Sequence, residues 1–208
     1  MYEHVFLQGI KEDSSGTTII IKIPDKQLTE MIMQKHMKTA ELRLDDGRTI
    51  TAEQRKKAYA TIRDIADFTG YFPEEQKEHL KYIHMERTGC EHFSLSDCTV
   101  DTAREFINTI LEFALENGVP LSEKAINRTD DIGRYLYYCI KHKRCCICGQ
   151  KGEIHHVDTI GMGFDRNHYD DSKNRKICLC RLHHTIAHQR GMDAFEKMYK
   201  VYGIVVDD

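Results

Sequence analysis

Residues 145–156 read CCICGQKGEIHH and concentrate thiols and imidazoles in one short stretch. The stretch begins with a CxxC pair followed by a glycine, a spacing at which a tight turn directs two thiolates toward one metal ion. Residues 177–184, ICLCRLHH, offer a cysteine and a histidine separated by two residues as the second half of such a site. The sequence therefore predicts a structural zinc with four ligands, Cys145, Cys148, Cys180 and His183.

Two further cysteines lie close to this predicted site. Cys146 is one position out of the CxxC register, and the sequence gives it no role. Cys178 competes with Cys180 as a ligand but would need a longer connection to His183, so we interpret it as a small core residue. Eight cysteines in a reducing compartment indicate metal binding rather than disulfides. Metal binding would also supply folding energy that a loop-rich segment of this size lacks.

Four histidines of the same two motifs are not used by the predicted zinc set. Adjacent residues of a strand point to opposite faces, so His155 and His156 are expected to have separate tasks. His184 and His188 lie four residues apart, as neighbours on one helix face do, and together could bind a metal. We predict a second, catalytic metal held by His155 and His184, with His188 as a further candidate ligand and His156 as the general base. The alternative for the helical pair is two exposed histidines without a function.

The charge of the chain is unevenly distributed. Residues 141–190 carry ten Lys and Arg against five Asp and Glu, a local charge of +5 in a chain whose net charge is -3. A basic, histidine-rich segment of this kind can bind a phosphate backbone, although an ordinary solvated surface could have the same composition. The predicted DNA-binding residues are Arg144, Lys173, Arg175, Lys176, Arg181 and Arg190.

The whole sequence predicts an α+β fold. Short β-branched runs indicate strands near the start of the chain, and apolar residues at helical spacing dominate after them. The expected strands are 5–10 and 17–23, with a hairpin over 41–50, and the expected helices are 25–38, 51–70, 73–83, 102–118 and 132–142. The expected N-caps are Thr51 and Thr102, each followed three residues later by Gln or Glu, and the expected helix stops are Gly70 and Gly118.

The second half of the sequence resembles a known family. CxxC, IHHVD, an asparagine and LCRLHHTIAH together are similar to the HNH endonuclease motif, the ββα-metal fold, and HHTIAHQRGMDAFEKMY resembles the end of that domain in phage and prophage nucleases. The resemblance covers residues 135–202. It implies that His156 activates water and that His155 and His184 bind the metal. His188 corresponds to a further ligand of colicin-like HNH domains.

The sequence departs from the family pattern at the central asparagine. In the family this residue orients the base through hydrogen bonds and fixes the hairpin loop. Asn174 is the nearest asparagine and is assigned to the catalytic set, but it lies about one position farther from His184 than usual, where Arg175 falls. His168 and Arg175 are therefore alternatives. Imidazole ligands suit Mn²⁺, Ni²⁺ or Zn²⁺ better than Mg²⁺, which prefers oxygen ligands. Substrate phosphate and water could still complete the coordination shell of a bound Mg²⁺.

The first part of the sequence resembles another family. Short strands followed by residues 51–81, TAEQRKKAYATIRDIADFTGYFPEEQKEHLK, and 106–123, FINTILEFALENGVPLSE, are similar to the NinB (Orf) family of phage recombination mediators. The resemblance implies binding of single-stranded DNA, cooperation with single-strand-binding protein and a homodimer. With the change in charge and ligand density near residue 130, it predicts two domains, an α+β NinB-like domain over 1–130 and a zinc-stabilised HNH domain over 131–208.

These observations favour one function over its main alternative. The leading hypothesis is a metal-dependent HNH endonuclease that hydrolyses DNA in phage recombination, replication or DNA processing. The alternative is a noncatalytic, zinc-stabilised mediator that binds single-stranded DNA. The filled base and ligand positions favour the nuclease. No apolar stretch is long enough to cross a bilayer and the start of the chain lacks a signal-peptide pattern, so a cytoplasmic location is expected, the host bacterial cytoplasm if the gene belongs to a phage or prophage.

Overall fold

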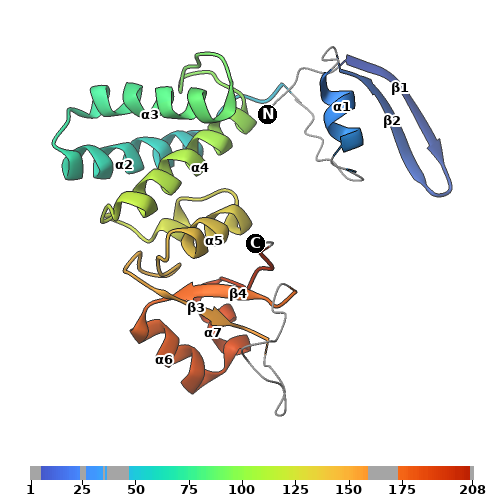
Figure 1. The fold of residues 1–208 in the computed structure, drawn as a ribbon. Coiled ribbons are helices and arrows are strands. Elements are labelled where there is room, and N and C mark those ends of the chain that lie inside the picture. Colours follow the sequence, from blue (N-terminus) through green and yellow to red (C-terminus); the bar gives the residue numbers. More distant parts are fainter. Residues whose placement is uncertain (1–5, 24–26, 35, 37–46, 159–172, 207–208) are drawn as a thin grey trace.

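The computed structural model describes residues 6–23, 27–34, 36, 47–158 and 173–206 (Figure 1). Within these residues the protein has seven α-helices, one short 3-10 helix and two antiparallel sheets of two strands each. The expected α+β class is therefore confirmed. The hairpin expected over 41–50 falls largely outside the described residues. Among the described helices, none combines the length and the apolar character that crossing a membrane would require.

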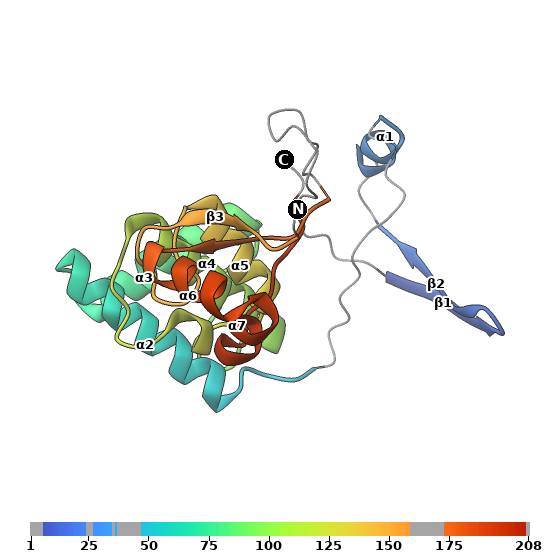
Figure 2. The same ribbon diagram turned by 90° about the horizontal axis from the view of Figure 1, so that it is seen from below.

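The chain begins with a hairpin and a short helix. β1 (Phe6–Asp13) and β2 (Gly16–Lys22) pair antiparallel, and Ile10 faces Ile19 in the ladder. The β-branched residues of the second strand favour this extended conformation. α1 (Gln27–Gln34) follows, and in both views these elements lie to one side of the other helices (Figure 1, Figure 2). The strands and the helix expected here are present, with their limits shifted by a few residues.

Two antiparallel helices, α2 (Ala52–Thr69) and α3 (Pro73–Thr88), begin the main body. The Gln54 N–H donates to the Thr51 hydroxyl and the Thr51 N–H donates to the Gln54 amide oxygen, each over 3.1 Å. The expected capping box is thus confirmed. Gly70 ends α2 with a positive φ of 81°, a conformation that glycine adopts without a Cβ clash, as expected.

The start of α4 (Val100–Asn117) differs from the expectation. Its N-cap is Thr99, which has an extended backbone and accepts a hydrogen bond of 3.1 Å from the Thr102 N–H. The prediction that Thr102 caps this helix was wrong, because Thr102 already lies in the first helical turn. Two threonines stand three residues apart here, and the local pattern alone did not separate them. The expected end of the helix at Gly118 is confirmed.

The core of the body forms where α2 and α4 pack together. Ile62 and Ile65 of α2, with Phe106 and Ile110 of α4, are almost fully buried. Their helical spacing places them on one face of each helix, so the amphipathic pattern of the sequence explains the packing. α5 (Ile132–Lys141) packs against α4 on the side away from α3 (Figure 1).

This core continues into the second half of the chain. Tyr135 and Cys139 of α5 belong to the same cluster of buried side chains as Ile177 and Leu179. The cluster extends without interruption from the α2 and α4 packing to the small sheet. The predicted boundary near residue 130 therefore lies within a continuous core and stays a prediction.

The second sheet and two helices complete the molecule. β3 (Glu153–His156) pairs antiparallel with β4 (Lys176–Leu179). α6 (Arg181–Arg190) and α7 (Met192–Tyr199) follow and lie on one side of this sheet, while α5 lies on the other (Figure 1). The sheet is therefore placed between α5 and the two final helices.

The register of this sheet decides where the paired histidines lie. His155 faces Ile177 and His156 faces Lys176. Near the end of the chain, Ile204 and Lys176 exchange backbone hydrogen bonds of 2.9 Å and 2.7 Å, so the last segment covers the free edge of β4. The histidines of β3 therefore lie at the end of the sheet where the last segment of the chain pairs with β4.

Candidate metal centres

The CxxC pair lies in a tight turn. The Cys145 N–H donates to the Gln150 carbonyl over 2.7 Å, and the Gly149 N–H donates to the Cys145 carbonyl over 2.8 Å. Gly149 has a φ of 71°, a left-handed conformation that a side chain would disfavour. The pairing of Arg144 with Lys151 closes the turn. The local sequence therefore forms the knuckle that the CxxC-Gly pattern predicts.

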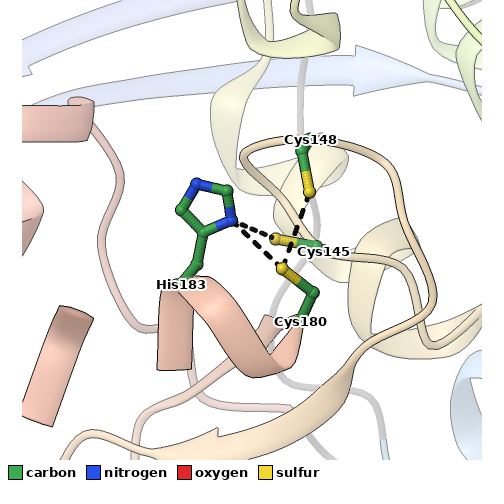
Figure 3. A group of neighbouring side chains, drawn as sticks. All are labelled: Cys145, Cys148, Cys180 and His183. Carbon is green, nitrogen blue, oxygen red and sulfur yellow. Dashed lines mark hydrogen bonds between the residues drawn. The ribbon is translucent and has the colours of Figure 1, made fainter. Parts of the chain in front are cut away.

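The four residues of the predicted zinc set come together at the start of α6 (Figure 3). The Nδ1 atom of His183 lies 3.4 Å from Cys145 Sγ and 3.2 Å from Cys180 Sγ. The Sγ atoms of Cys148 and Cys180 are 3.7 Å apart. Ligand atoms around a tetrahedral zinc are separated by about 3.5–3.8 Å, given bonds of about 2.0–2.3 Å. The cluster can therefore hold a metal ion such as zinc.

The thiols of this cluster differ in how easily they ionise. Burial raises the pKa of Cys145 and raises that of Cys148 to about 12. Burial also opposes ionisation of Cys180, but hydrogen bonds from the His183 backbone N–H and the neighbouring thiols lower its pKa below the ordinary value. Burial lowers the pKa of His183, which favours a neutral ring. Three neighbouring thiolates would repel one another, and a bound cation removes that repulsion.

Cys146, to which the sequence gave no role, is a core residue. Its side chain is fully buried, and its N–H donates to the Cys178 carbonyl over 3.0 Å. Its carbonyl accepts a hydrogen bond of 2.9 Å from the Tyr135 hydroxyl. Cys146 thus joins the knuckle to β4 and to α5. Cys178 is also fully buried, which confirms its interpretation as a small core residue.

A second group consists of three histidines from β3 and α6. Ring nitrogens of His155, His184 and His188 lie within 4.8 Å of one another. The Nε2 atoms of His184 and His188 are 3.0 Å apart, and the His155 ring lies edge-on to both, with centroid distances of 4.7 Å and 5.0 Å. Imidazole nitrogens that converge in this way can bind one divalent ion. The expected four-residue helical spacing therefore does bring His184 and His188 of α6 to His155.

The electrostatics of this group keep its inner member neutral. His155 is 8% exposed, and burial, followed by the positive charge that His184 and His188 would carry, lowers its pKa to about 4. A neutral ring retains a lone pair for a metal ion at physiological pH. The donor set therefore fits a cation.

The predicted base and its orienting residue lie next to this group. The His156 side chain is exposed and follows the buried His155 in β3, so the two adjacent histidines do face opposite sides. Asn174 is half-buried and precedes β4. Both residues have interactions within the protein. His168, another candidate for the central position, lies outside the described residues.

The predicted DNA-binding residues differ in their surroundings. The Arg144 guanidinium donates to the Leu115 carbonyl over 2.9 Å, at the C-terminal end of α4, and the Lys176 side chain is buried. Arg175 is exposed but forms an ion pair. The other three residues of the set are exposed, namely Lys173, Arg181 and Arg190.

Asp158 is a residue of interest that the sequence pattern alone did not indicate. It lies two residues after the end of β3, and its carboxylate accepts hydrogen bonds from Arg175 of 2.7 Å, 2.8 Å and 3.1 Å. The hydrogen bonds from the Arg175 side chain and backbone lower the pKa of Asp158. The motif IHHVD contains this aspartate, so the signal was present, but its partner lies seventeen residues away.

Comparison with models of protein families gives a match. A family model described as “Putative HNHc nuclease” matches residues 22–208, which include the helical body and both metal-binding groups. A search of curated proteins gives no match, and a search of solved structures gives none either.

Proposed function

Because this chain belongs to the family described as “Putative HNHc nuclease”, we propose that it is a metal-dependent endonuclease that hydrolyses phosphodiester bonds in DNA. One observation carries the proposal. The ring nitrogens of His155, His184 and His188 converge closely enough to bind one ion, and His156 is the next residue of the same strand. An ion site beside a histidine base provides the two groups that metal-assisted phosphodiester hydrolysis needs.

The three converging histidines are the proposed ligands of the catalytic metal. A divalent ion such as Mg²⁺, Mn²⁺, Ni²⁺ or Zn²⁺ bound there would neutralise charge on the nonbridging phosphate oxygen and the leaving group. The low pKa of His155 leaves its ring neutral and free to donate a lone pair. Three nitrogen donors favour Mn²⁺, Ni²⁺ or Zn²⁺ over Mg²⁺, which prefers oxygen.

His156 is the proposed general base. An unprotonated ring nitrogen of His156 would accept a proton from the attacking water, which histidine can do near neutral pH. Its exposed side chain allows water and a DNA strand to reach it. Asn174 is the proposed orienting residue, with Arg175 as the other candidate for this position.

Cys145, Cys148, Cys180 and His183 are the proposed ligands of the structural zinc. Two of these ligands are the N-cap and the third residue of α6, and His184 directly follows the second. Zinc at this position would fix the first turn of the helix that carries two catalytic ligands. The structural ion thus supports the catalytic one by holding α6 against the knuckle.

The basic side chains near the site are proposed to hold the DNA backbone. Lys173, Arg181 and Arg190 are exposed and are the strongest candidates for phosphate contacts. The proposal keeps three weaker candidates, whose side chains are buried or engaged within the protein: Arg144, Arg175 and Lys176.

The biological context belongs to the same proposal. The resemblance of residues 1–130 to NinB-like mediators supports a role in phage recombination, replication or DNA processing. It also suggests single-strand-binding protein as a partner, a homodimer, and action in the cytoplasm of a bacterial host. The noncatalytic mediator is the alternative that an experiment must exclude.

The decisive experiment compares wild type with His156→Ala on linear, nicked, single-stranded and four-way junction DNA across Mg²⁺, Mn²⁺, Ni²⁺ and Zn²⁺. We expect cleavage to fall by about 10²-fold or more, since a general base contributes at least that much. DNA affinity and zinc content should not change, because His156 belongs to neither proposed metal set.

The matched control is His92→Ala, which removes an exposed histidine far from the site in sequence and should leave cleavage unchanged. Full activity of His156→Ala would show that another group is the base. A wild-type protein that binds DNA but cleaves no substrate with any of the four metals would favour the noncatalytic mediator.

A further inference from the structure

Arg175 and Asp158 connect the two segments that flank residues 159–172. Asp158 lies two residues after His156, and Arg175 directly precedes Lys176, the residue that faces His156 in the sheet. A contact between the two residues therefore acts on the end of β3 where the proposed base lies.

The contact between them is multiple. The Arg175 backbone N–H donates to Asp158 Oδ2 over 2.7 Å, and the guanidinium Nε and Nη2 donate to Asp158 Oδ1 over 3.1 Å and 2.8 Å. The Val157 N–H donates in turn to the Arg175 carbonyl over 2.9 Å. These bonds extend the β3–β4 ladder past His156, so the base does not lie at a frayed strand end.

An exposed ion pair alone would hold the end of β3 only weakly. Arg175 and Asp158 are partly exposed, and isolated surface ion pairs contribute little to stability. Here one carboxylate receives a backbone and two side-chain hydrogen bonds from a single residue, which fixes its geometry more firmly than a lone charge pair does. The effect to be expected is therefore on local geometry and not on global stability.

The last segment of the chain packs against the same place. A Cβ added at Gly203 would lie 2.6 Å from a Val157 methyl carbon and 3.0 Å from the Arg175 Cβ. The Gly203 backbone therefore touches both residues, and the Ile204 pairing with Lys176 holds it there. The contact between Arg175 and Asp158 is thus supported by close packing from a third segment.

We propose that Arg175 and Asp158 form a lock that positions His156 for cleavage, so that Arg175, kept above as a weaker candidate for a DNA contact, is instead a positioning residue. The proposal rests on the proposed nuclease function. Arg175 acts through the strand end and the carboxylate, and not directly on the metal ligands or the reacting atoms. A base displaced by about 1 Å can slow a reaction by about 10²-fold, so loosening of the lock should lower turnover.

The test uses the full-length, zinc-containing protein and a DNA substrate that wild type cleaves. Three variants, Asp158→Ala, Arg175→Ala and the double variant, are compared with Lys197→Ala, which removes an exposed cation of α7 outside the lock and outside every proposed site. We expect each single lock variant to lower kcat by at least tenfold with DNA affinity nearly unchanged. The double variant should be no worse than Asp158→Ala, and Arg175→Lys should recover part of the loss. Lys197→Ala should leave both kcat and DNA affinity unchanged.

A second measurement does not depend on cleavage. Amide hydrogen exchange at Val157 should become faster in Asp158→Ala, while exchange at Cys146, whose N–H bonds to the other end of β4, should not change. Zinc content and the melting temperature should stay at wild-type values, since the lock lies outside both metal sets.

The possible results separate the lock from the proposed function. Normal kcat in Asp158→Ala would overturn the positioning role, as would a loss in Arg175→Ala that appears only in DNA affinity. Additive losses in the double variant would show that the two residues act separately and would also overturn it. If wild type cleaves nothing, the nuclease proposal fails and the role in cleavage fails with it. Exchange at Val157 then decides whether the lock itself exists.

Discussion

At the scale of single residues, two adjacent cysteines are both fully buried, but only Cys145 belongs to the candidate metal site. The thiol of Cys145 lies beside His183 Nδ1, whereas Cys146 is packed in the core with both backbone groups bonded to other elements. The same substitution at the two positions should therefore have different effects on the metal.

Cys145→Ala should reduce zinc from about one ion per chain to nearly none, because it removes one of four ligands. Cys146→Ala should keep the zinc and lose only packing. Metal analysis of the purified variants measures both. Loss of zinc from Cys146→Ala alone would mean that the ligand register is wrong.

A buried histidine far from either metal group makes stability depend on pH. His84 lies edge-on to Phe93 and Phe106, and its Nδ1 is 2.7 Å from the Thr109 hydroxyl. Burial lowers its pKa to about 4, an effect that Glu105 opposes. The folded protein therefore holds this ring neutral at a pH at which the unfolded chain protonates it.

As the pH falls below about 6.5, the unfolded chain gains a proton at His84 that the folded protein takes up only near pH 4. The free energy of unfolding should therefore decrease between these values, by up to about 1.4 kcal/mol per pH unit from this group. His84→Gln should flatten that slope in urea denaturation, while His79→Gln, an exposed histidine on the same helix, should not. An unchanged slope in His84→Gln would show that its ring is not the titrating group.

At the scale of elements, the start of α4 shows how a helix limit is chosen. Thr99 and Thr102 both carry hydroxyls at a plausible starting point, and their Oγ1 atoms lie 2.9 Å apart. Only Thr99 has the extended backbone of an N-cap and accepts from the N–H three residues on. That geometry assigns the cap to Thr99.

Thr99→Ala should lower the free energy of unfolding by about 1 kcal/mol, the usual effect of removing a cap. Thr102→Ala should lower the free energy of unfolding by only a few tenths of that value, because its hydroxyl contacts the Thr99 hydroxyl but does not itself cap the helix. Chemical denaturation of both variants gives the comparison. A larger loss from Thr102→Ala would restore the cap expected from the sequence.

At the scale of the whole molecule, one buried cluster connects the helices to the metal-bearing sheet. Side chains of α4, α5 and β4 belong to it, and the Tyr135 hydroxyl also binds the knuckle carbonyl of Cys146. Removal of zinc should therefore lower the stability of the helices as well as that of the knuckle. Two separate domains that meet near residue 130 predict instead that zinc removal destabilises the second half of the chain alone.

Scanning calorimetry with and without a chelator distinguishes these outcomes. The shared core predicts a single transition that moves down by about 10–20 °C, as a loss of about 5 kcal/mol would produce in a chain of this size. Two transitions, of which only one moves, would support separate domains over 1–130 and 131–208.

The sequence by itself determined features that depend on neighbours a few residues apart. The CxxC-Gly turn, the capping box at Thr51 and the i, i+4 pair of His184 and His188 all follow from local spacing, because a turn or a helix fixes the positions of such neighbours. Thiols and imidazoles also indicate metal binding by their chemical type. The fold class and the candidate metal groups could therefore be predicted from the sequence alone.

Only the tertiary structure decided the contacts between residues far apart in the chain. Arg144, Lys176 and Arg175 look alike in the sequence, as basic residues near a histidine motif. In the fold the Arg144 guanidinium binds a carbonyl near the end of α4, the side chain of Lys176 is buried, and Arg175 pairs with Asp158. Their differences depend on which surfaces pack together and on the strand register. Charge and spacing along the chain predict neither the packing of surfaces nor the strand register. The fold therefore decides which residues of the basic segment have partners within the protein and which remain exposed.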